Sequence, residues 1–394
     1  MERQKDASMA DRLSPRQILD RLVAFPTVSR DSNLPLIDWV EDYLQSHGIR
    51  AHRHWNEDRS KAALMAHVGP QVTGAVVLSG HTDVVPVDGQ HWTSDPFTVT
   101  ERQGRLYGRG TCDMKGFDAL ALWALVEGHH RSLRRPLQIA LSYDEETGCM
   151  GAPPLIETMQ QVMPKGALAI IGEPSRMKAV NGHKGGAGYR VHVRGFEVHS
   201  SLLPQGVSAI MEAARLIMWA NARNAENRAK PVGPLAQLFD PPFTTVHVGM
   251  INGGTAHNIT AADCRHVMEF RVIPGESPQD WCRAFEAEVD VLRAAIKSVR
   301  PEADIFLERF FDVPPLVPEA GGAAEAMVRR LTGDNATHVV SYGTEAGHFQ
   351  AAGYSAVICG PGDIAQAHQA DEYLELSEFA AGQHFMERLL ADLA

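Results

Sequence analysis

The sequence predicts an α/β fold, a largely parallel sheet with helices on both faces, with a second α+β domain inserted in it. Short apolar segments alternate with helical segments before residue 181 and again after residue 300, a pattern typical of parallel sheets. Between these limits the segments alternate in polarity, as half-exposed antiparallel strands do. The 394 residues also exceed what one ordinary core accommodates, so two domains are expected.

The first domain begins with two helices and continues with apolar strands. Ser14 is a suitable N-cap for the first helix. Pro35 suits the first turn of the second, predicted over residues 36–44. Strands are predicted over residues 74–80, 137–143 and 167–172, with a helix over 118–129. The carboxyl ends of such strands are where sites form in parallel sheets.

The pattern changes after residue 181. Antiparallel strands are predicted over residues 189–195, 244–250 and 264–272, and helices over 207–222 and 278–298. The alternation of strands and helices resumes at Ala303, and residues 376–393 form the last helix. We therefore assign residues 1–180 and 300–394 to a discontinuous first domain and residues 181–299 to an inserted domain.

Composition excludes several classes of function. The net charge is -11 and no dense Lys/Arg run occurs, which argues against nucleic-acid binding. No segment is apolar enough to span a membrane, and the N-terminus lacks the apolar core of a signal peptide. Met9 is an alternative start to Met1. Five scattered cysteines without a CxxC pair predict reduced thiols in the cytoplasm, with Cys112 and Cys149 as small buried hydrophobes.

Five residues of metal-ligand type lie in separate short signatures. They are His81, Asp113, Glu146, Glu173 and His368. Two imidazoles and three carboxylates suit two divalent metals that share one bridging carboxylate. Such a pair activates water and polarises a carbonyl, so the ligand set predicts hydrolysis.

Two neighbours of these ligands have roles of their own in this hypothesis. Asp83 projects to the same side of an extended backbone as His81, where it accepts the spare ring N–H. Glu145 stands beside Glu146 and suits a general base. The alternatives are a surface turn containing His81 and Asp83, and a solvated acidic turn for the two glutamates.

Together these signatures resemble the M20 metallopeptidase family, and most closely its acetylornithine deacetylase branch, from about Ile18 to the C-terminus. Further segments carry the same resemblance: Trp92-x-x-Asp95-Pro-Phe, Gly253-Gly-Thr-Ala-His-Asn258, Tyr342-Gly-Thr-Glu-Ala346 and Gly360-Pro-Gly362. A set this long, in this order, is a specific signal. The chain departs from the family pattern at Ile259-Thr-Ala and at Glu269-Phe-Arg271, both away from the ligands.

The resemblance implies a two-metal catalytic domain with an inserted lid or dimerisation domain. One zinc would be held by His81, Asp113 and Glu173, and the other by Asp113, Glu146 and His368, with Asp113 bridging. Cobalt or manganese fit similar ligands. Glu145 would be the general base and Asp83 the partner of the histidine ligand.

The resemblance also implies roles for residues outside the ligand set. His199 would reach a neighbouring subunit's site and stabilise the oxyanion, in a homodimer formed through the inserted domain. Arg271 would grip the substrate carboxylate, and Asn258, Glu345 and Gly360 would lie near the substrate. The alternatives are a strand-end histidine for His199 and a solvated strand charge for Arg271.

The reaction implied is hydrolysis of an N-acyl amino acid, with N-acetyl-L-ornithine the first choice, a step of arginine biosynthesis. The alternatives in the same family are a succinyl-diaminopimelate desuccinylase and another N-acyl-amino-acid deacylase. An inactive binding or scaffold relative is the alternative from a different class. It is disfavoured because every ligand position and Glu145 are filled.

Overall fold

The computed structural model describes residues 12–394 and divides into two compact units. Unit 1 runs to Asn181 and resumes in Pro318–His338 and Thr344–Ala394. Unit 2 comprises Gly182–Val317 and Val339–Gly343. The choice between Met1 and Met9 as the start falls outside the described residues.

The inserted unit ends later than the sequence predicted. Residues 300–317 and 339–343, which we assigned to the first domain, lie in unit 2. The reason is β12 (Asp304–Val313), which pairs antiparallel with β9 (Gly185–Arg194) along its length. The predicted resumption of the parallel pattern at Ala303 is therefore wrong, because the segment completes the antiparallel sheet instead.

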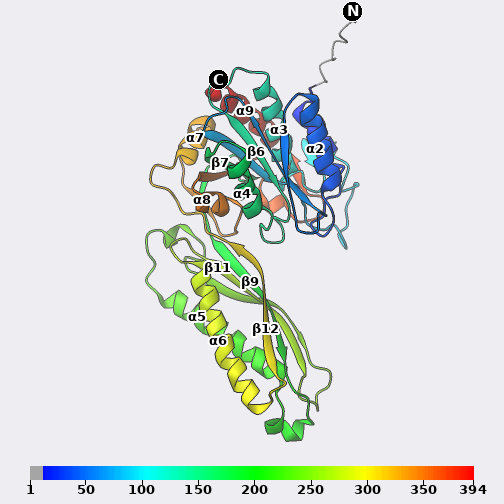
Figure 1. Cartoon of the computed structure of the whole chain (residues 1–394), viewed down its shortest axis with the longest axis vertical. Helices are drawn as coiled ribbons and strands as arrows, with labels where there is room; N and C mark the ends of the chain where they lie inside the picture. The colour runs from blue at the N-terminus through cyan, green and yellow to red at the C-terminus, as the bar shows by residue number, and fades with distance from the viewer. Residues whose placement is uncertain (1–11) are drawn as a thin grey trace, which may run out of the picture. The chain divides into compact units, whose positions relative to one another are not determined.

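Unit 1 is built on a mixed sheet of order β1-β2-β6-β3-β7-β14-β8-β13 (Figure 1). Its central strands β6, β3, β7 and β14 are parallel to their neighbours within that group, whereas β1 and β2 are antiparallel additions that the sequence analysis did not predict. The bounds are β1 (Ala51–Trp55), β2 (Ala62–Val68), β3 (Ala75–His81), β6 (Leu137–Ser142), β7 (Gly166–Pro174), β8 (Val180–His183), β13 (His338–Val340) and β14 (Ser355–Gly360). A small second sheet joins β4 (Thr100–Arg102), β5 (Arg105–Tyr107) and β15 (Tyr373–Glu375).

Helices cover both faces of the large sheet, as predicted. Strands β3 and β6 are buried along their whole length, which requires cover on either side. Helices α3 and α7 pack on the sheet with α1 and α9 against them, and α4 and α8 form a second group (Figure 1). The bounds are α1 (Pro15–Val23), α2 (Leu34–Ser46), α3 (Lys115–His129), α4 (Ala152–Val162), α7 (Ala323–Thr332), α8 (Ala346–Ala351) and α9 (Leu376–Leu393).

Local signals explain where the first helices begin. Ser14 accepts the backbone N–H of Gln17, whose side chain in turn accepts the N–H of Ser14, a complete capping box. Pro35 lies in the first turn of α2, where its missing N–H leaves no hydrogen bond unmade. The N-cap at Ser14 and the place of Pro35 in the first turn are confirmed, although α2 begins at Leu34, two residues before the predicted start.

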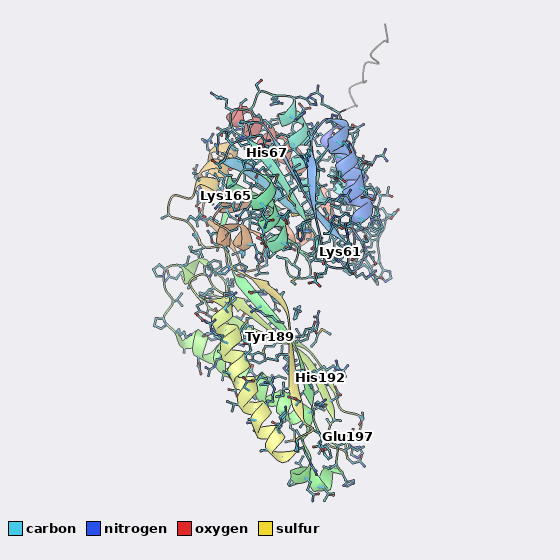
Figure 2. All side chains as sticks on the ribbon, in the orientation of Figure 1. Lys61, His67, Lys165, Tyr189, His192 and Glu197 are labelled. Atoms are coloured by element: carbon cyan, nitrogen blue, oxygen red, sulfur yellow. The ribbon has the colours of Figure 1, made fainter. Side chains whose placement is uncertain are left out.

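Unit 2 is an antiparallel sheet of order β10-β11-β9-β12 with two long helices on one face. Its remaining elements are β10 (Thr245–Gly253), β11 (Asp263–Val272), α5 (Ala209–Ala229) and α6 (Pro278–Val299). Burial alternates along the strands: on β9, Tyr189 is buried toward the helices, whereas His192 is on the half-exposed opposite face (Figure 2). The predicted α+β character of this unit is confirmed.

Among residues 12–394, none of the helices combines the length and the apolar character that crossing a membrane requires.

Candidate metal centre

The parallel strands of unit 1 deliver several of the predicted ligands to one edge of the sheet. His81 is the last residue of β3, Glu145 and Glu146 follow β6 after two intervening residues, and Glu173 lies near the end of β7. Because β3 pairs with both β6 and β7, these carboxyl ends are adjacent. Asp113 arrives from the turn before α3.

Glycine shapes that turn. Gly110 has φ +84°, a left-handed conformation, and a Cβ there would lie 2.9 Å from the Val84 side chain and 3.1 Å from that of Lys115. A larger residue would be strained in conformation and crowded by its neighbours. Gly110 therefore permits the turn that presents Asp113 to the cluster.

Asp113 lies between the two histidines. Its Oδ1 is 3.1 Å from Nε2 of His81, and its Oδ2 is 3.1 Å from Nε2 of His368. His368 Nε2 is also 3.0 Å from Oε2 of Glu146, and His81 Nε2 is 3.9 Å from Oε1 of Glu173. The structure thus brings all five predicted ligands into one cluster.

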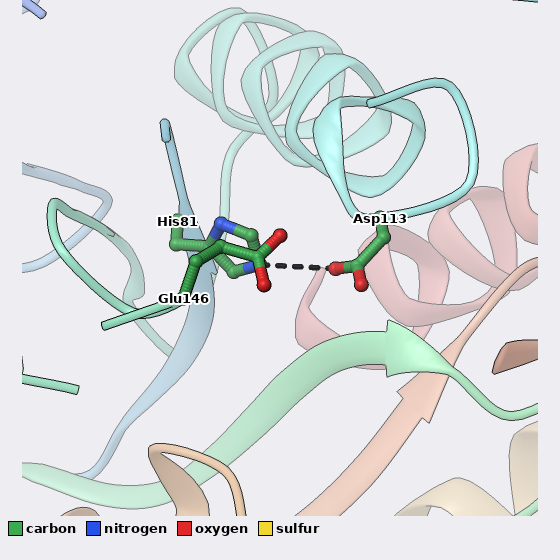
Figure 3. Close-up of side chains that lie close together, drawn as sticks. All are labelled: His81, Asp113 and Glu146. Carbon is green, nitrogen blue, oxygen red and sulfur yellow. Dashed lines mark hydrogen bonds and ion pairs between the residues drawn. The ribbon is translucent and has the colours of Figure 1, made fainter. Parts of the chain in front are cut away.

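These residues fit divalent metals. Among residues 12–394, two groups have ligand atoms that all lie within 4.8 Å of one another: His81, Asp113 and Glu146 (Figure 3), and His81, Glu145 and Glu173. Within the described part of the chain, the buried Oε1 of Glu146 has no hydrogen-bond partner, as expected of an atom that binds a metal. Imidazole and carboxylate are ligands that zinc accepts. Both groups contain His81 and one contains Glu145, so they differ from the partition that the resemblance implied.

With no metal bound, the cluster holds strongly perturbed pKa values. Burial, reinforced by Asp113, raises the pKa of Glu146 to about 8 and that of Glu173 well above its usual range. Hydrogen bonds that His368 donates to Asp113 and Glu146 raise the pKa of His368 to about 10. Burial opposes ionisation of Asp113, but hydrogen bonds with the two histidines hold its pKa well below the ordinary value. Cations bound within this cluster would stabilise the ionised forms of its carboxylates.

His81 is oriented by Asp83, but through a different atom than predicted. Nδ1 of His81 lies 2.9 Å from the main-chain oxygen of Asp83 and 3.6 Å from its Oδ1. A ring N–H donated to that carbonyl leaves Nε2 free to face a metal, so the tautomer follows from this contact. The predicted carboxylate contact is the longer of the two.

The Asp83 carboxylate instead organises the segment after β6. It accepts the backbone N–H of Glu145 at 3.2 Å and that of Glu146 at 3.4 Å. Ser29 Oγ donates to it at 2.7 Å, and Lys61 contacts both the Ser29 carbonyl and Asp144. Ser29 and Lys61 could not be identified from the sequence, because neither stands in a signature and both come from loops remote in sequence.

Glu145 is half-buried beside the ligands. Burial, reinforced by the charges of Glu345 and Asp113, raises its pKa to about 7. Its Oε1 lies 3.2 Å from the thiol of Cys149, which is buried as predicted and donates to the carboxylate. A carboxylate with a pKa near neutrality suits general acid–base chemistry.

Glu345 lies at the start of α8 and is almost fully buried. Ser142 donates to its Oε1, and Ser79 Oγ lies 3.4 Å from its Oε2. Burial raises its pKa to about 7. Both serines lie on the strands that carry the ligands, so Glu345 supports the sheet edge beneath the cluster.

Gly360, the last residue of β14, allows a close approach between strands. A Cβ at this position would lie 1.9 Å from the carbonyl oxygen of Gly172 and 2.7 Å from that of Glu173. The glycine therefore lets β14 pack against the segment of β7 that carries a ligand. This packing is the role visible within unit 1.

The remaining predicted residues lie in unit 2. His199 and Asn258 are exposed and adjacent: the N–H of Ser200 donates to the Asn258 carbonyl at 2.9 Å, and His199 bridges to Ile259. Arg271, on β11, is separate from this pair and lies 2.5 Å from Glu269. The metal cluster of unit 1 contains none of the three.

Comparison with known proteins places the chain among hydrolases. The model of peptidase family M20/M25/M40 matches residues 77–392. An acetylornithine deacetylase of Myxococcus xanthus is 38% identical over 95% of this chain and 96% of its own length. One of Proteus mirabilis (strain HI4320) is 33% identical, with 95% of each chain covered.

The fold also matches solved structures. An M20 family metallo-carboxypeptidase of Sulfolobus solfataricus superposes with a TM-score of 0.77 at 16% identity, covering 96% of this chain and 98% of that one. Such low identity supports the fold alone. The family model and the two full-length relatives carry the conclusion: the chain belongs to peptidase family M20/M25/M40.

Proposed function

We propose that this protein is a two-metal amidohydrolase that converts N-acetyl-L-ornithine and water to L-ornithine and acetate. The observation that carries the proposal is the position of Asp113, whose two carboxylate oxygens each face a different histidine, with Glu145 alongside. The substrate is taken from the relatives of Myxococcus and Proteus, which match over nearly the whole chain.

His81, Asp113 and Glu173 would hold one metal, and Asp113, Glu146 and His368 the other. Zinc is the first choice, and cobalt or manganese suit the same ligands. When bound, the metals supply a polarised acyl carbonyl and a water of lowered pKa. The contacts of His368 with Asp113 and Glu146 support this partition over the one in which Glu145 is a ligand.

Glu145 is the proposed general base. Its carboxylate takes one proton from the attacking water, whose oxygen bonds to the acyl carbon. The same proton then passes to the amide nitrogen as the carbon–nitrogen bond breaks, so the amine leaves with its nitrogen protonated.

His199 is proposed as an oxyanion donor for a neighbouring subunit. Its Nδ1 accepts the N–H of Ser201 at 3.3 Å, so the neutral ring carries its proton on Nε2. An exposed Nε2–H can donate to a developing oxyanion. This role requires a homodimer, which we propose forms through unit 2; sedimentation velocity tests it directly, since a monomer would exclude it.

Arg271 is proposed to bind the α-carboxylate of the substrate through its guanidinium, with Asn258 nearby on the substrate side. Glu345 and Gly360 are proposed to lie near the bound substrate, beneath the metal cluster at the edge of the sheet. We also propose a cytoplasmic location, where the five free cysteines would stay reduced.

The deciding experiment measures amine release by metal-loaded protein from N-acetyl-L-ornithine beside N-succinyl-L,L-diaminopimelate and a panel of N-acetyl amino acids. A preference for N-acetyl-L-ornithine supports the proposal. A preference for the succinylated substrate would replace it with a desuccinylase. Inactivity across the panel with two metals bound would favour a non-catalytic relative.

A further inference from the structure

The two histidine ligands are held in different ways. His81 ends a buried strand, and its side chain is 1% exposed. His368 lies in the loop after the short helix η3 (Ile364–Gln366), and its side chain is 49% exposed. Its φ of +63° is in the left-handed region, which a histidine adopts only where its surroundings favour it. A contact from another segment to the main chain of His368 would therefore help to hold this conformation.

Gln90 supplies such a contact. Its Nε2 donates to the main-chain oxygen of His368 at 3.0 Å. Its Oε1 accepts from Arg109 Nη2 at 2.6 Å and from Trp92 Nε1 at 3.1 Å. Arginine and tryptophan can only donate, so the amide oxygen must face them and the amide nitrogen must face the carbonyl of His368.

Arg109 connects Gln90 to the main chain of Asp113, another proposed ligand. Its Nη1 lies 2.6 Å from Oε2 of Glu372, and both side chains are 1% exposed. The other oxygen of Glu372 accepts the main-chain N–H of Cys112 at 2.9 Å and that of Asp113 at 3.1 Å. A buried ion pair whose carboxylate oxygens are both hydrogen-bonded is rigid. It connects Gln90 to the backbone of Asp113, the proposed bridging ligand.

We propose that Gln90 is a positioning residue for the metal held through His368, and that the Arg109–Glu372 pair anchors it. The inference rests on the proposed two-metal function. Gln90 touches the main chain of His368 and acts on the metal only through that ligand. Its loss would leave the His368 loop less restrained and weaken the second metal, while the metal held by His81, Asp113 and Glu173 stays.

The substitution Gln90→Glu isolates this contact. A glutamate has the same shape and still accepts from Arg109 and Trp92, but its carboxylate cannot donate to the His368 carbonyl. Gln160→Glu is the matched control, because Gln160 on α4 donates to the carbonyl of Ala352 at 3.1 Å, outside the metal centre. Both variants change the net charge equally. Gln90→Asn is a second variant that adds no charge. Its side chain is one methylene shorter, so the amide lies farther from the His368 carbonyl.

The experiment titrates each metal-free protein with Zn²⁺ by calorimetry and with Co²⁺ by absorption. For Gln90→Glu and Gln90→Asn we expect a first equivalent bound as in the wild type and a second bound about 10-fold more weakly. Their melting temperatures should match that of Gln160→Glu, and activity should recover at raised metal concentration.

Three outcomes would overturn the inference. Unchanged affinity for both equivalents in the Gln90 variants would show that the tether is unnecessary, with the proposed function untouched. If both metal equivalents bound more weakly by the same factor, Gln90 would not act selectively on the metal held through His368. A wild-type protein that binds fewer than two metals would overturn the two-metal assignment itself.

Discussion

The two units differ in how buried their candidate functional side chains are. In unit 1 the candidate ligands are delivered by strand ends and contact one another, and His81 is 1% exposed. In unit 2, His199 and Asn258 are exposed, and the Arg271 side chain is 41% exposed. A metal centre needs preorganised, mutually fixed ligands, whereas groups that meet a substrate must stay accessible. Substitutions of the candidate ligands and Glu145 in unit 1 should therefore alter turnover, metal content or stability, and substitution of Arg271 in unit 2 mainly substrate affinity.

The largest expected effect follows from Glu145→Gln. The amide cannot accept a proton, so kcat should fall by about 10³-fold. Metal content, measured by mass spectrometry, should stay at two per chain. Glu157→Gln, at an exposed position on α4, is the control and should leave kcat unchanged.

Metal content also separates the two partitions of the ligands. Glu145 belongs to one of the two groups whose ligand atoms lie close together. Loss of one metal from the Glu145→Gln variant would make this residue a ligand, and retained turnover would remove its role as the base.

The next effect is on the stability of unit 1. In Gly360→Ala the new Cβ would meet backbone atoms of Gly172 and Glu173 that no side-chain rotation can relieve. We expect a loss of about 1–3 kcal/mol in unfolding free energy, with weaker metal binding because Glu173 moves. Thermal unfolding and metal titration measure both effects.

Gly233→Ala is the comparison in unit 2, because nothing lies within 4 Å of a Cβ at that position. Its melting temperature should stay within about 1 °C of the wild type. Equal melting of the two variants would contradict the close approach of β14 to β7 described above.

A smaller effect is expected at Arg271 in unit 2. Lysine keeps the charge but loses the two-pronged geometry that suits a carboxylate, so Arg271→Lys should raise KM about 10-fold with kcat nearly unchanged. Arg265→Lys is the control, because it lies on the same strand and the same face.

A truncated substrate tests the assignment of Arg271. N-acetylputrescine lacks the α-carboxylate but keeps the acetyl amide. If Arg271 binds that carboxylate, the wild type and Arg271→Lys should act on N-acetylputrescine equally well. A penalty that persists with this substrate would assign Arg271 to the structure of β11 instead.

Three of the candidate ligands, His81, Glu146 and Glu173, could be predicted because each follows an apolar strand, whereas His368 stands in no such local pattern. An apolar run ending in His81 or in Glu145-Glu146 marks a strand end, and Gly110 marks the turn that presents Asp113. Parallel strands then bring such ends together without further information. The fold class was predictable for the same reason, since burial on both faces leaves continuous apolar runs.

What could not be predicted depends on contacts remote in sequence. The 304–313 segment has no local feature that separates an edge strand of unit 2 from a new strand of unit 1; its pairing with β9 decides. The anchoring of the Asp113 backbone by Glu372 joins residues 259 positions apart. The preference of His81 for the main-chain oxygen of Asp83 depends on about an ångström of backbone geometry, which periodicity does not contain.

The smallest expected effect is a difference in pH response between the units of the metal-free protein. In unit 1, burial raises the pKa values of Glu146 and Asp118 to about 8 and of Glu345 to about 7. The folded state therefore keeps protons that the unfolded chain releases, and the free energy of unfolding falls as pH rises from 5 to 7. The opposing groups are unit 1 histidines whose pKa values burial lowers: His348, to about 4, and His47, His52, His67 and His129. Burial also raises the pKa values of Glu145, Glu173 and Glu372, which add to the decline.

Unit 2 should respond with the opposite sign. Burial lowers the pKa of His266 to about 4, so between pH 4 and 6.5 the unfolded chain binds the extra proton and stability rises with pH. Hydrogen exchange, expressed as protection factors at pH 5, 6 and 7, follows β3 and β11 separately in EDTA-treated protein. Added Zn²⁺ should abolish the decline in β3, because the metals replace the protons, and leave β11 unchanged. If the protection factors of metal-free β3 rose between pH 5 and 7, ionisation of the unit 1 carboxylates would not destabilise the folded state. Repulsion among these carboxylates would then not be what bound metals offset.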